Sequence, residues 1–224
     1  MNPNSFVKEM AGIKLPDVFN PYSQRCDVHD KADAPAARRR NLRLLLSSAK
    51  QLGVDTIWMG RDLGYRGGRR TGLALTDERH LPMMQHVYPG SASVKTTWGP
   101  EVAERTATEI WAVLCQLDKP PLLWNVFPFH PHESGDPFTN RRFTARELSY
   151  VDELNAALIS WLGIRRIISI GQDAASYAEK FGVEVACVRH PSYGGVKDFR
   201  RGIGQLHGID VSKQVNSSTQ TMLF

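Results

Sequence analysis

Four short runs of apolar residues recur along the chain, and each is followed at once by glycine or by polar residues. The runs cover residues 54–59, 121–124, 166–170 and 183–188. Near-continuous apolar runs of this length predict strands that are buried on both faces, as in a parallel sheet. Ligands of such sheets bind in the crevice beyond the carboxyl ends of the strands, so the residues after each run are candidates for a site.

Segments with helical periodicity separate these runs. A helix is predicted from Pro35, a first-turn proline, to Gly53, and an amphipathic one over residues 100–117. A capping box at Thr144 opens a helix that is expected to reach Gly163, and a shorter helix covers residues 172–181. This alternation predicts an α/β fold, a three-layer α/β/α sandwich on a four-stranded parallel sheet.

The domain organisation follows from length and composition. With 224 residues, 42% of them hydrophobic, the chain can bury one sizeable core, which we assign to residues 34–209. Residues 1–33 carry three prolines and little periodicity, and are predicted to form an irregular arm, while the polar residues 210–224 are predicted to be disordered. No membrane span or secretory signal is recognisable, so we expect a cytoplasmic monomer.

The cysteines argue against a metal centre. Cys26, Cys115 and Cys187 are widely spaced and form no C-x-x-C pair, which favours a reducing compartment over a disulfide, iron–sulfur or zinc scaffold. The segment 26–30 does gather a thiol, an imidazole and two acids, but it lacks a second ligand pair at finger-like spacing. We interpret it as a polar loop and expect no metal and no cofactor.

The charge distribution favours an anionic partner. The net charge is +5 and the isoelectric point is about 9.2, with arginines clustered rather than spread evenly. We interpret the cluster 38–40 as the solvated face of a helix. A basic rim around a cleft suits a polyanion such as DNA. The candidate DNA-binding arginines are Arg66, Arg69, Arg70, Arg200 and Arg201.

Three polar side chains occupy the predicted strand ends. Asp62 lies in a glycine- and arginine-rich loop after the first run, Asn125 follows the second, and His190 follows the fourth. Glycines such as Gly60 and Gly64 let backbone N–H groups approach a ligand closely. We therefore expect the three side chains to converge in one cleft.

The chemistry of this trio suits hydrolysis of an N-glycosidic bond. There is no G-x-S-x-G elbow, phosphate-binding lysine loop or G-x-G-x-x-G helix start. Asp62 can hold a water and face a sugar that becomes cationic, and His190 can donate a hydrogen bond to an oxygen that becomes negative. Asn125 offers a donor and an acceptor on one planar group, as reading a nucleobase edge requires.

The ordered set Gly60-Arg61-Asp62-Leu63-Gly64, Asn125 and His190-Pro191-Ser192 resembles the uracil-DNA glycosylase superfamily, in its branch without an iron–sulfur cluster. The resemblance extends from about residue 54 to residue 195. It implies base-excision repair: uracil is flipped out of DNA and removed without a metal. It also implies that Asp62 is the catalytic acid, that Asn125 and His190 bind the base, and that Ser192 binds a DNA phosphate.

The sequence departs from the family pattern at three places. Gly64 stands where some members have the tyrosine that excludes thymine, and Tyr65 comes one position later. Leu75 stands where many have a stacking phenylalanine, which leaves Phe127 or Tyr65 as alternative stacking partners. Tyr193 is the large residue after the His-Pro-Ser motif and the candidate for the wedge that fills the vacated stack.

Two other functions compete with uracil removal. The same chemistry could act on other deaminated bases, hypoxanthine or xanthine, because Gly64 leaves the pocket less guarded. A non-catalytic module could bind flipped bases without cleaving them. Asp62 discriminates against the second alternative, because a carboxylate that faces DNA phosphates weakens binding unless it takes part in the chemistry.

Overall fold

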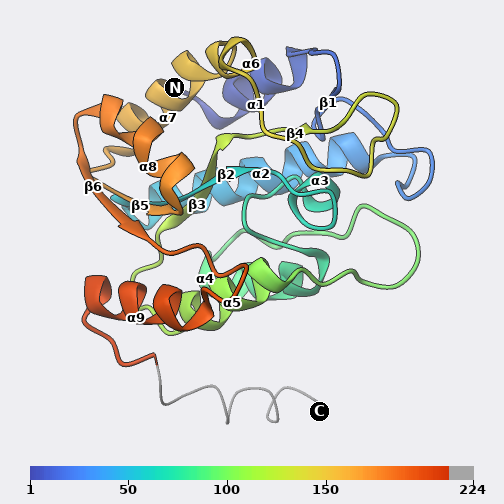
Figure 1. Ribbon diagram of the computed structural model, residues 1–224. Coiled ribbons are helices and arrows are strands. Elements are labelled where there is room, and N and C mark those ends of the chain that lie inside the picture. The colour runs from blue at the N-terminus through green and yellow to red at the C-terminus, as the bar shows by residue number, and fades with distance from the viewer. Residues whose placement is uncertain (212–224) are drawn as a thin grey trace.

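Four parallel strands form the central sheet of the computed structural model, which describes residues 1–211 (Figure 1). Their order is β3-β2-β5-β6. The strands are β2 (Thr56–Asp62), β3 (Leu122–Phe127), β5 (Arg166–Ile170) and β6 (Glu184–Val188). Helices cover both faces of the sheet, so the predicted α/β/α sandwich is confirmed.

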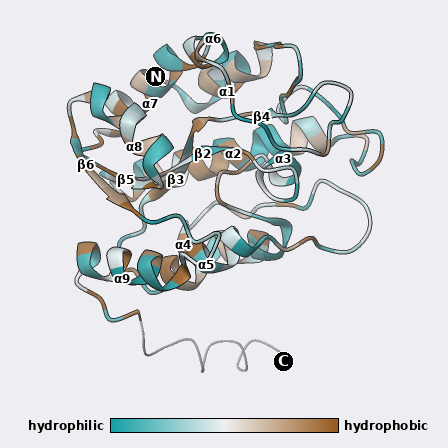
Figure 2. Cartoon of the chain, in the orientation of Figure 1, coloured by the Kyte–Doolittle hydropathy of each residue, from teal (hydrophilic) through white to brown (hydrophobic). Residues whose placement is uncertain are grey.

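The helices pack on the sheet through their apolar positions. They include α2 (Ala34–Gln51), α5 (Arg105–Leu114), α7 (Asp152–Leu162), α8 (Gln172–Ala178) and α9 (Val196–His207). Helices α7 and α8 lie on one side of the sheet, and α5 and α9 lie on the other (Figure 1). Hydrophobic residues occur in the strands and in the helices that cover them (Figure 2), and β3 is buried along its whole length.

Short elements connect these layers. They are α3 (Gly68–Thr71), the 3-10 helix η1 (Glu78–Met83), α4 (Met84–Val87), α6 (Ala145–Ser149), the 3-10 helix η2 (Glu179–Phe181), and the antiparallel pair β1 (Val18–Phe19) and β4 (His130–Pro131). The capping box at Thr144 is present, but the helix that it begins is only α6. The helical conformation is interrupted before Val151, which is the N-cap of α7. None of the helices within residues 1–211 is long and apolar enough to cross a membrane.

The expected irregular arm is wrong for its first part, because residues 3–12 form helix α1 (Pro3–Gly12). Asn2 caps this helix by accepting a hydrogen bond from the N–H of Asn4, and a proline occupies the first turn. Phe6 is buried, and its ring lies 6.0 Å from that of Trp124 in β3. The start of the chain is therefore part of the core. Disorder was predicted for residues 210–224, and residues 212–224 of this range lie outside the described part of the chain.

Helix α9 was not predicted from the sequence. It places Phe199 and Ile203 in the core, but two glycines within it, Gly202 and Gly204, weaken the helical signal. A side chain at Gly202 would contact Val188 of β6 at 3.0 Å, so this glycine lets the helix lie close to the edge of the sheet. The low helix propensity of Gly202 is offset by the close packing of α9 on β6 that it allows.

Candidate active site

A cleft of about 620 Å³ opens at the carboxyl ends of β2 and β5. One wall comes from the segment after β2 and from the start of α5, and includes Gly64, Leu75 and Glu104. Another part of the lining comes from the ends of β5 and β6, and includes Gly171, Arg189 and His190. The volume lies within the range of about 300–1,000 Å³ that is typical of ligand pockets.

Asn125 lies beside this cleft with its amide group unused. The residue is inside β3, paired in register with Gly60 of β2, and only 1% of it is exposed. Neither its Oδ1 nor its Nδ2 has a hydrogen-bond partner within residues 1–211. A side chain at Gly60 would lie 2.5 Å from Asn125 Oδ1, so a glycine is needed there. A buried amide without partners costs about 1–3 kcal/mol per group, so both groups of this amide are available to a partner that reaches them from the cleft.

His190 is held as a neutral hydrogen-bond donor. Its Nδ1 accepts a hydrogen bond of 3.2 Å from the backbone N–H of Ser192, so in the neutral ring the proton is on Nε2. Burial lowers the pKa of His190, and the nearby charges of Arg61 and Arg189 lower it further. Both effects favour a neutral imidazole whose Nε2–H is free to donate.

Asp62 is the last residue of β2, and it is nearly buried. Its side chain is 8% exposed and is paired with the neighbouring Arg61, whose Nε lies 2.6 Å from Oδ2. Burial raises the pKa of Asp62, while Arg61 opposes this shift by stabilising the carboxylate. Arg61 also reaches Asp173 at 3.6 Å, and Arg142 lies 3.4 Å from the same carboxylate. These four side chains of alternating charge all line the cleft.

The cleft occupies the same place in the fold as the sheet crevice predicted from the sequence, and the fold itself is known from another protein. The chain shares its fold with Pedobacter heparinus SMUG2. The TM-score to this wild-type crystal structure is 0.57 over 92% of the present chain and 94% of the SMUG2 chain, at 12% sequence identity. No protein-family model matches the sequence, and no curated protein matches it.

Within this SMUG2-like fold, two residues that line the cleft have left-handed backbone conformations without being glycine. Leu75 has φ of 53° and Tyr193 has φ of 52°. Such conformations cost about 1–3 kcal/mol and cluster at binding sites. Leu75 lies against Gly60, and would also contact a side chain placed there. Tyr193 is 96% exposed, at the rim. It is the one Phe, Trp or Tyr among the cleft-lining residues of the described chain.

The two alternative stacking partners, Phe127 and Tyr65, differ in their positions. Phe127 is fully buried and packs on Phe129 and Phe143, with ring centroids 5.4 and 5.2 Å away. Its assignment as a substrate-binding residue is wrong, because its position at the end of β3 points it into the core. Tyr65 lies at the edge of the site, where its backbone N–H donates to Asn140, a cleft-lining residue.

Two of the predicted DNA-binding arginines are core residues. Arg69 is 4% exposed, and its guanidinium lies over the rings of Phe19 and Phe138 at 4.1 and 5.0 Å. Arg70 is buried and pairs with Glu78. The prediction is wrong for both, because α3 turns this basic stretch inward, where aromatic rings and buried acids replace water.

The other predicted DNA-binding residues keep more exposed positions. Ser192 lines the cleft beside His190, and Arg66 is exposed near Glu104. Arg200 is paired with Glu109 of α5 at 2.6 Å, and Arg201 with Asp198 at 2.6 Å, both away from the cleft lining. These two arginines therefore stabilise α9 and its contact with α5.

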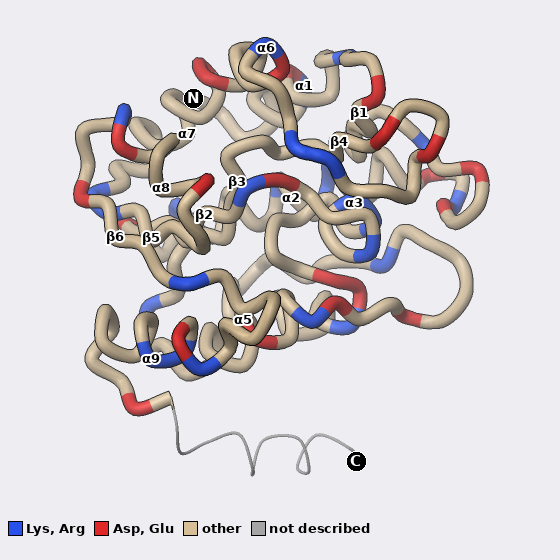
Figure 3. Tube along the Cα trace, viewed as in Figure 1, with Lys and Arg blue, Asp and Glu red and all other residues tan. Residues whose placement is uncertain are grey.

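Sequence analysis missed several residues that line the cleft. Arg142 and Arg189 are exposed cations on it, and Glu104 adds a second acid. Basic positions occur in the segments after β2 and β6 and before α6, around the strand ends (Figure 3). Two of these residues could have been predicted from the sequence: Arg189 because it directly precedes His190, and Arg142 because it belongs to an arginine pair. Glu104 gave no comparable signal, because it is one acid in a polar segment.

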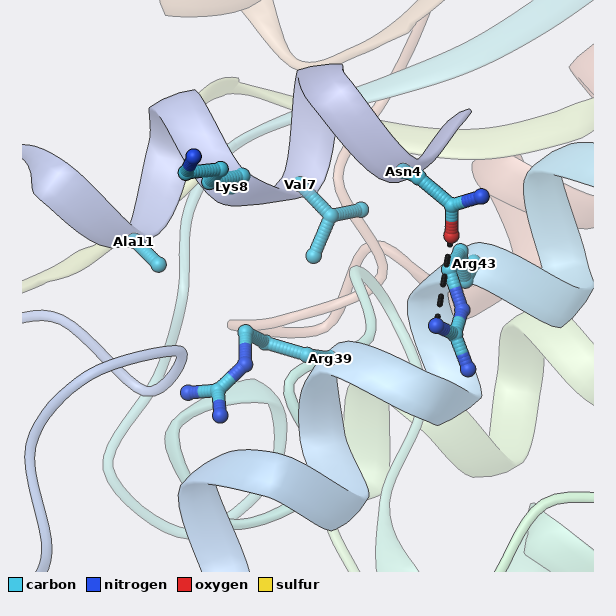
Figure 4. Close-up of a pocket in the computed structure, with 6 residues that line it drawn as sticks. All are labelled: Asn4, Val7, Lys8, Ala11, Arg39 and Arg43. Carbon is cyan, nitrogen blue, oxygen red and sulfur yellow. Dashed lines mark hydrogen bonds between the residues drawn. The ribbon is translucent and has the colours of Figure 1, made fainter. Parts of the chain in front are cut away.

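A second hollow of about 390 Å³ lies between α1 and α2 (Figure 4). It is lined by Asn4, Val7, Lys8, Ala11, Arg39 and Arg43, and it contains none of the predicted site residues. Within residues 1–211, no group of three or more His, Cys, Asp or Glu side chains is placed to hold a metal ion.

Proposed function

We propose that the protein is a DNA glycosylase that hydrolyses the N-glycosidic bond of uracil in DNA, releasing uracil and leaving an abasic site. The observation that carries this proposal is the unpaired amide of Asn125 beside the cleft. A planar group that offers both a donor and an acceptor matches the N3–H and O4 of uracil. The SMUG2-like fold and the order of the motifs support the same class of reaction.

The leaving base would be stabilised by His190. Breaking the bond between the sugar C1′ and the base nitrogen leaves the electron pair on the base, where it spreads onto O2. The Nε2–H of the neutral His190 can donate to this oxygen as the charge develops. Preorganised donors of this kind contribute most in the transition state, because they need no reorganisation.

Asp62 would act on the other side of the broken bond. Its carboxylate can stabilise positive charge on the sugar and position a water whose oxygen attacks C1′. The proton lost by that water passes to the carboxylate, which completes the hydrolysis. The raised pKa of Asp62 makes it a better proton acceptor than an exposed aspartate.

The rim of the cleft has the groups needed to hold a flipped nucleotide. Tyr193 is exposed and large enough to fill the gap in the base stack, and Ser192 can donate to a phosphate. Arg142 and Arg189 supply positive charge on the same face. The scheme uses only these side chains and a water molecule.

One assay tests the proposal and its two alternatives. Identical duplex oligonucleotides would carry uracil, thymine opposite guanine, hypoxanthine or xanthine, and excision would be read as alkali-labile sites. Fastest cleavage at uracil supports the proposal, whereas fastest cleavage at a purine would replace it by a deaminated-purine glycosylase.

A variant separates an enzyme from a module that only binds flipped bases. Asp62→Asn keeps the shape of the side chain and removes its charge, so excision is expected to slow steeply while affinity for uracil-containing DNA holds or rises. Unchanged excision would mean that another acid carries the chemistry. Preferential binding of uracil DNA by the parent protein without any excision would establish the binding module.

A further inference from the structure

Glu104 is an acid in the cleft that the scheme above does not use. It directly precedes α5, lines the wall beside Gly64, and is half-buried. No side-chain hydrogen bond or ion pair holds its carboxylate within residues 1–211. A carboxylate at a DNA-binding cleft weakens affinity for phosphates, so its place there calls for a contact with the substrate.

Two glycines make the space that this carboxylate fills. A side chain at Gly67 would collide with Glu104 Oε2, and a Cβ at Gly64 would lie 3.5 Å from Oε1. The position that Gly64 leaves without a side chain is therefore occupied from α5. The pocket is less open than the sequence suggests.

Buried acids fix Glu104 in this position. Its backbone N–H donates to Asp77 Oδ2 at 2.6 Å, and the N–H of Val102 donates to Glu78 Oε2 at 3.0 Å. Asp77 and Glu78 are both fully buried, at the start of η1. The segment that carries Glu104 is thus attached to the core rather than free to swing. Burial raises the pKa of Glu104, and the charge of Asp77 adds to this shift while Arg66 opposes it.

The contacts of the proposed scheme leave one edge of the base for Glu104. His190 and Glu104 both line the cleft, Asn125 lies against Gly60, and Glu104 lies against Gly64. If O2 of uracil faces His190 and the N3–O4 edge faces Asn125, the edge left for the lining beside Gly64 is the one that carries C5. A hydrogen at C5 leaves room for water on the carboxylate, whereas a methyl group displaces it.

We propose that Glu104 is a specificity-determining residue that excludes thymine: its carboxyl group stands opposite C5 of the flipped base and rejects a methyl group there. This inference rests on the proposed function. Its physical cause is the cost of stripping water from a carboxyl group without supplying a hydrogen bond in return. Because no side chain within residues 1–211 bonds this carboxyl group, nothing in that part of the chain offsets the penalty that a methyl group imposes.

The test compares uracil and thymine, each opposite guanine, in otherwise identical duplexes under single-turnover conditions. Glu104→Ala is expected to raise the ratio of thymine to uracil excision at least about tenfold, since one methyl group in a pocket changes rates by roughly 10–200-fold. Glu104→Gln keeps a polar group that needs water, and the ratio should stay within about threefold of the parent value. Glu101→Ala, in the same segment but exposed, is the matched control for loss of one negative charge.

Binding gives a second readout that does not depend on cleavage. The dissociation constants of duplexes with 2′-fluorinated, uncleavable uridine or thymidine are expected to converge in Glu104→Ala, and melting curves verify that the variants are folded. An unchanged thymine-to-uracil ratio in both readouts overturns the inference while the proposed function stands. A parent protein that neither excises uracil nor prefers uracil duplexes overturns both.

Discussion

The backbone N–H of Ser192 donates a hydrogen bond to Nδ1 of His190, two residues earlier. This contact assigns the ring proton to Nε2, and the lowered pKa of His190 keeps the ring neutral near pH 7. The geometry of the loop, rather than a neighbouring acid, therefore selects the tautomer. The same serine is exposed to the cleft, so the residue that orients the imidazole also lies where a phosphate would bind.

Replacing His190 should slow catalysis far more than binding. Loss of one preorganised donor to a developing anion costs about 3–4 kcal/mol, so His190→Ala is expected to reduce single-turnover excision of uracil several hundred-fold. The dissociation constant for uncleavable uracil DNA should change by less than about fivefold. A rate within about threefold of the parent would remove His190 from the mechanism.

Asn125→Asp is expected to change which base is accepted. The substitution exchanges the amide donor for an acceptor, so the hydrogen bond to O4 of uracil is lost, and a base with an amino group in place of O4 gains one. Excision of uracil and cytosine, each opposite guanine, measures the exchange. Asn155→Asp offers a contrast, because Asn155 is an equally buried amide whose partners are Trp124, Val126 and Tyr177. It should lower stability without changing base choice.

Tyr193 should matter more for duplex than for single-stranded DNA. A wedge fills the stack that a flipped base vacates, and this gap exists only in the duplex. Tyr193→Ala is expected to slow excision from duplex DNA roughly tenfold, in line with about 1–3 kcal/mol for a stacked aromatic contact. Tyr193→Phe should keep the parent rate. Equal losses on both kinds of DNA would contradict the wedge role.

The salt dependence of DNA binding distinguishes cleft arginines from core arginines. Arg142→Ala and Arg189→Ala are each expected to reduce the slope of log affinity against log salt by up to about one unit. Arg69→Ala should keep that slope and lower the melting temperature instead, because Arg69 packs between Phe19 and Phe138. A parent protein whose affinity does not vary with salt would exclude the cleft rim as a DNA surface.

Acid should destabilise the protein through His130. Burial lowers the pKa of His130 to about 4, and its Nε2 bonds the carbonyl of Thr139 at 2.8 Å. The unfolded chain binds a proton at this histidine near pH 6.5, so stability is full above that value and falls as the pH drops toward 4. The loss is on the order of 3 kcal/mol. The free energy of unfolding, measured with urea between pH 7 and 4, should depend less on pH in His130→Gln than in the parent. The exposed His86→Gln should match the parent.

Much of the fold was predictable because burial on both faces leaves a continuous apolar signal. The strand β5 matches its predicted run, Arg166 to Ile170, at both ends. The other strands shift by a few residues, and β2 continues through Asp62, because pairing with β3 holds polar residues that periodicity assigns to a loop. Helix α1 was missed because its proline was interpreted as a breaker, although proline in the first turn also starts helices.

The positions of the candidate site residues at the strand ends could be predicted from the sequence, whereas the positions of the charged side chains around them could not. Asp62 and His190 line one cleft, and Asn125 lies beside it, because the topology brings these strand ends together. Arg69 and Arg66 look alike in the sequence, yet one is buried and the other exposed, which only the direction of α3 decides. Glu104 reaches the cleft from a segment about 40 residues beyond Asp62, and no local pattern encodes such a contact.

The contact between Phe6 and Trp124 links helix α1 to β3, in which Trp124 is the neighbour of Asn125. Shortening the protein before residue 13 would therefore strip a supporting ring from that strand while leaving every cleft residue in the sequence. Such a truncated form should behave as a temperature-sensitive protein, active when cold and inactive when warm. Helix α1 is thus a structural support of β3, and a fusion partner that disturbs residues 3–12 should lower the melting temperature of the protein.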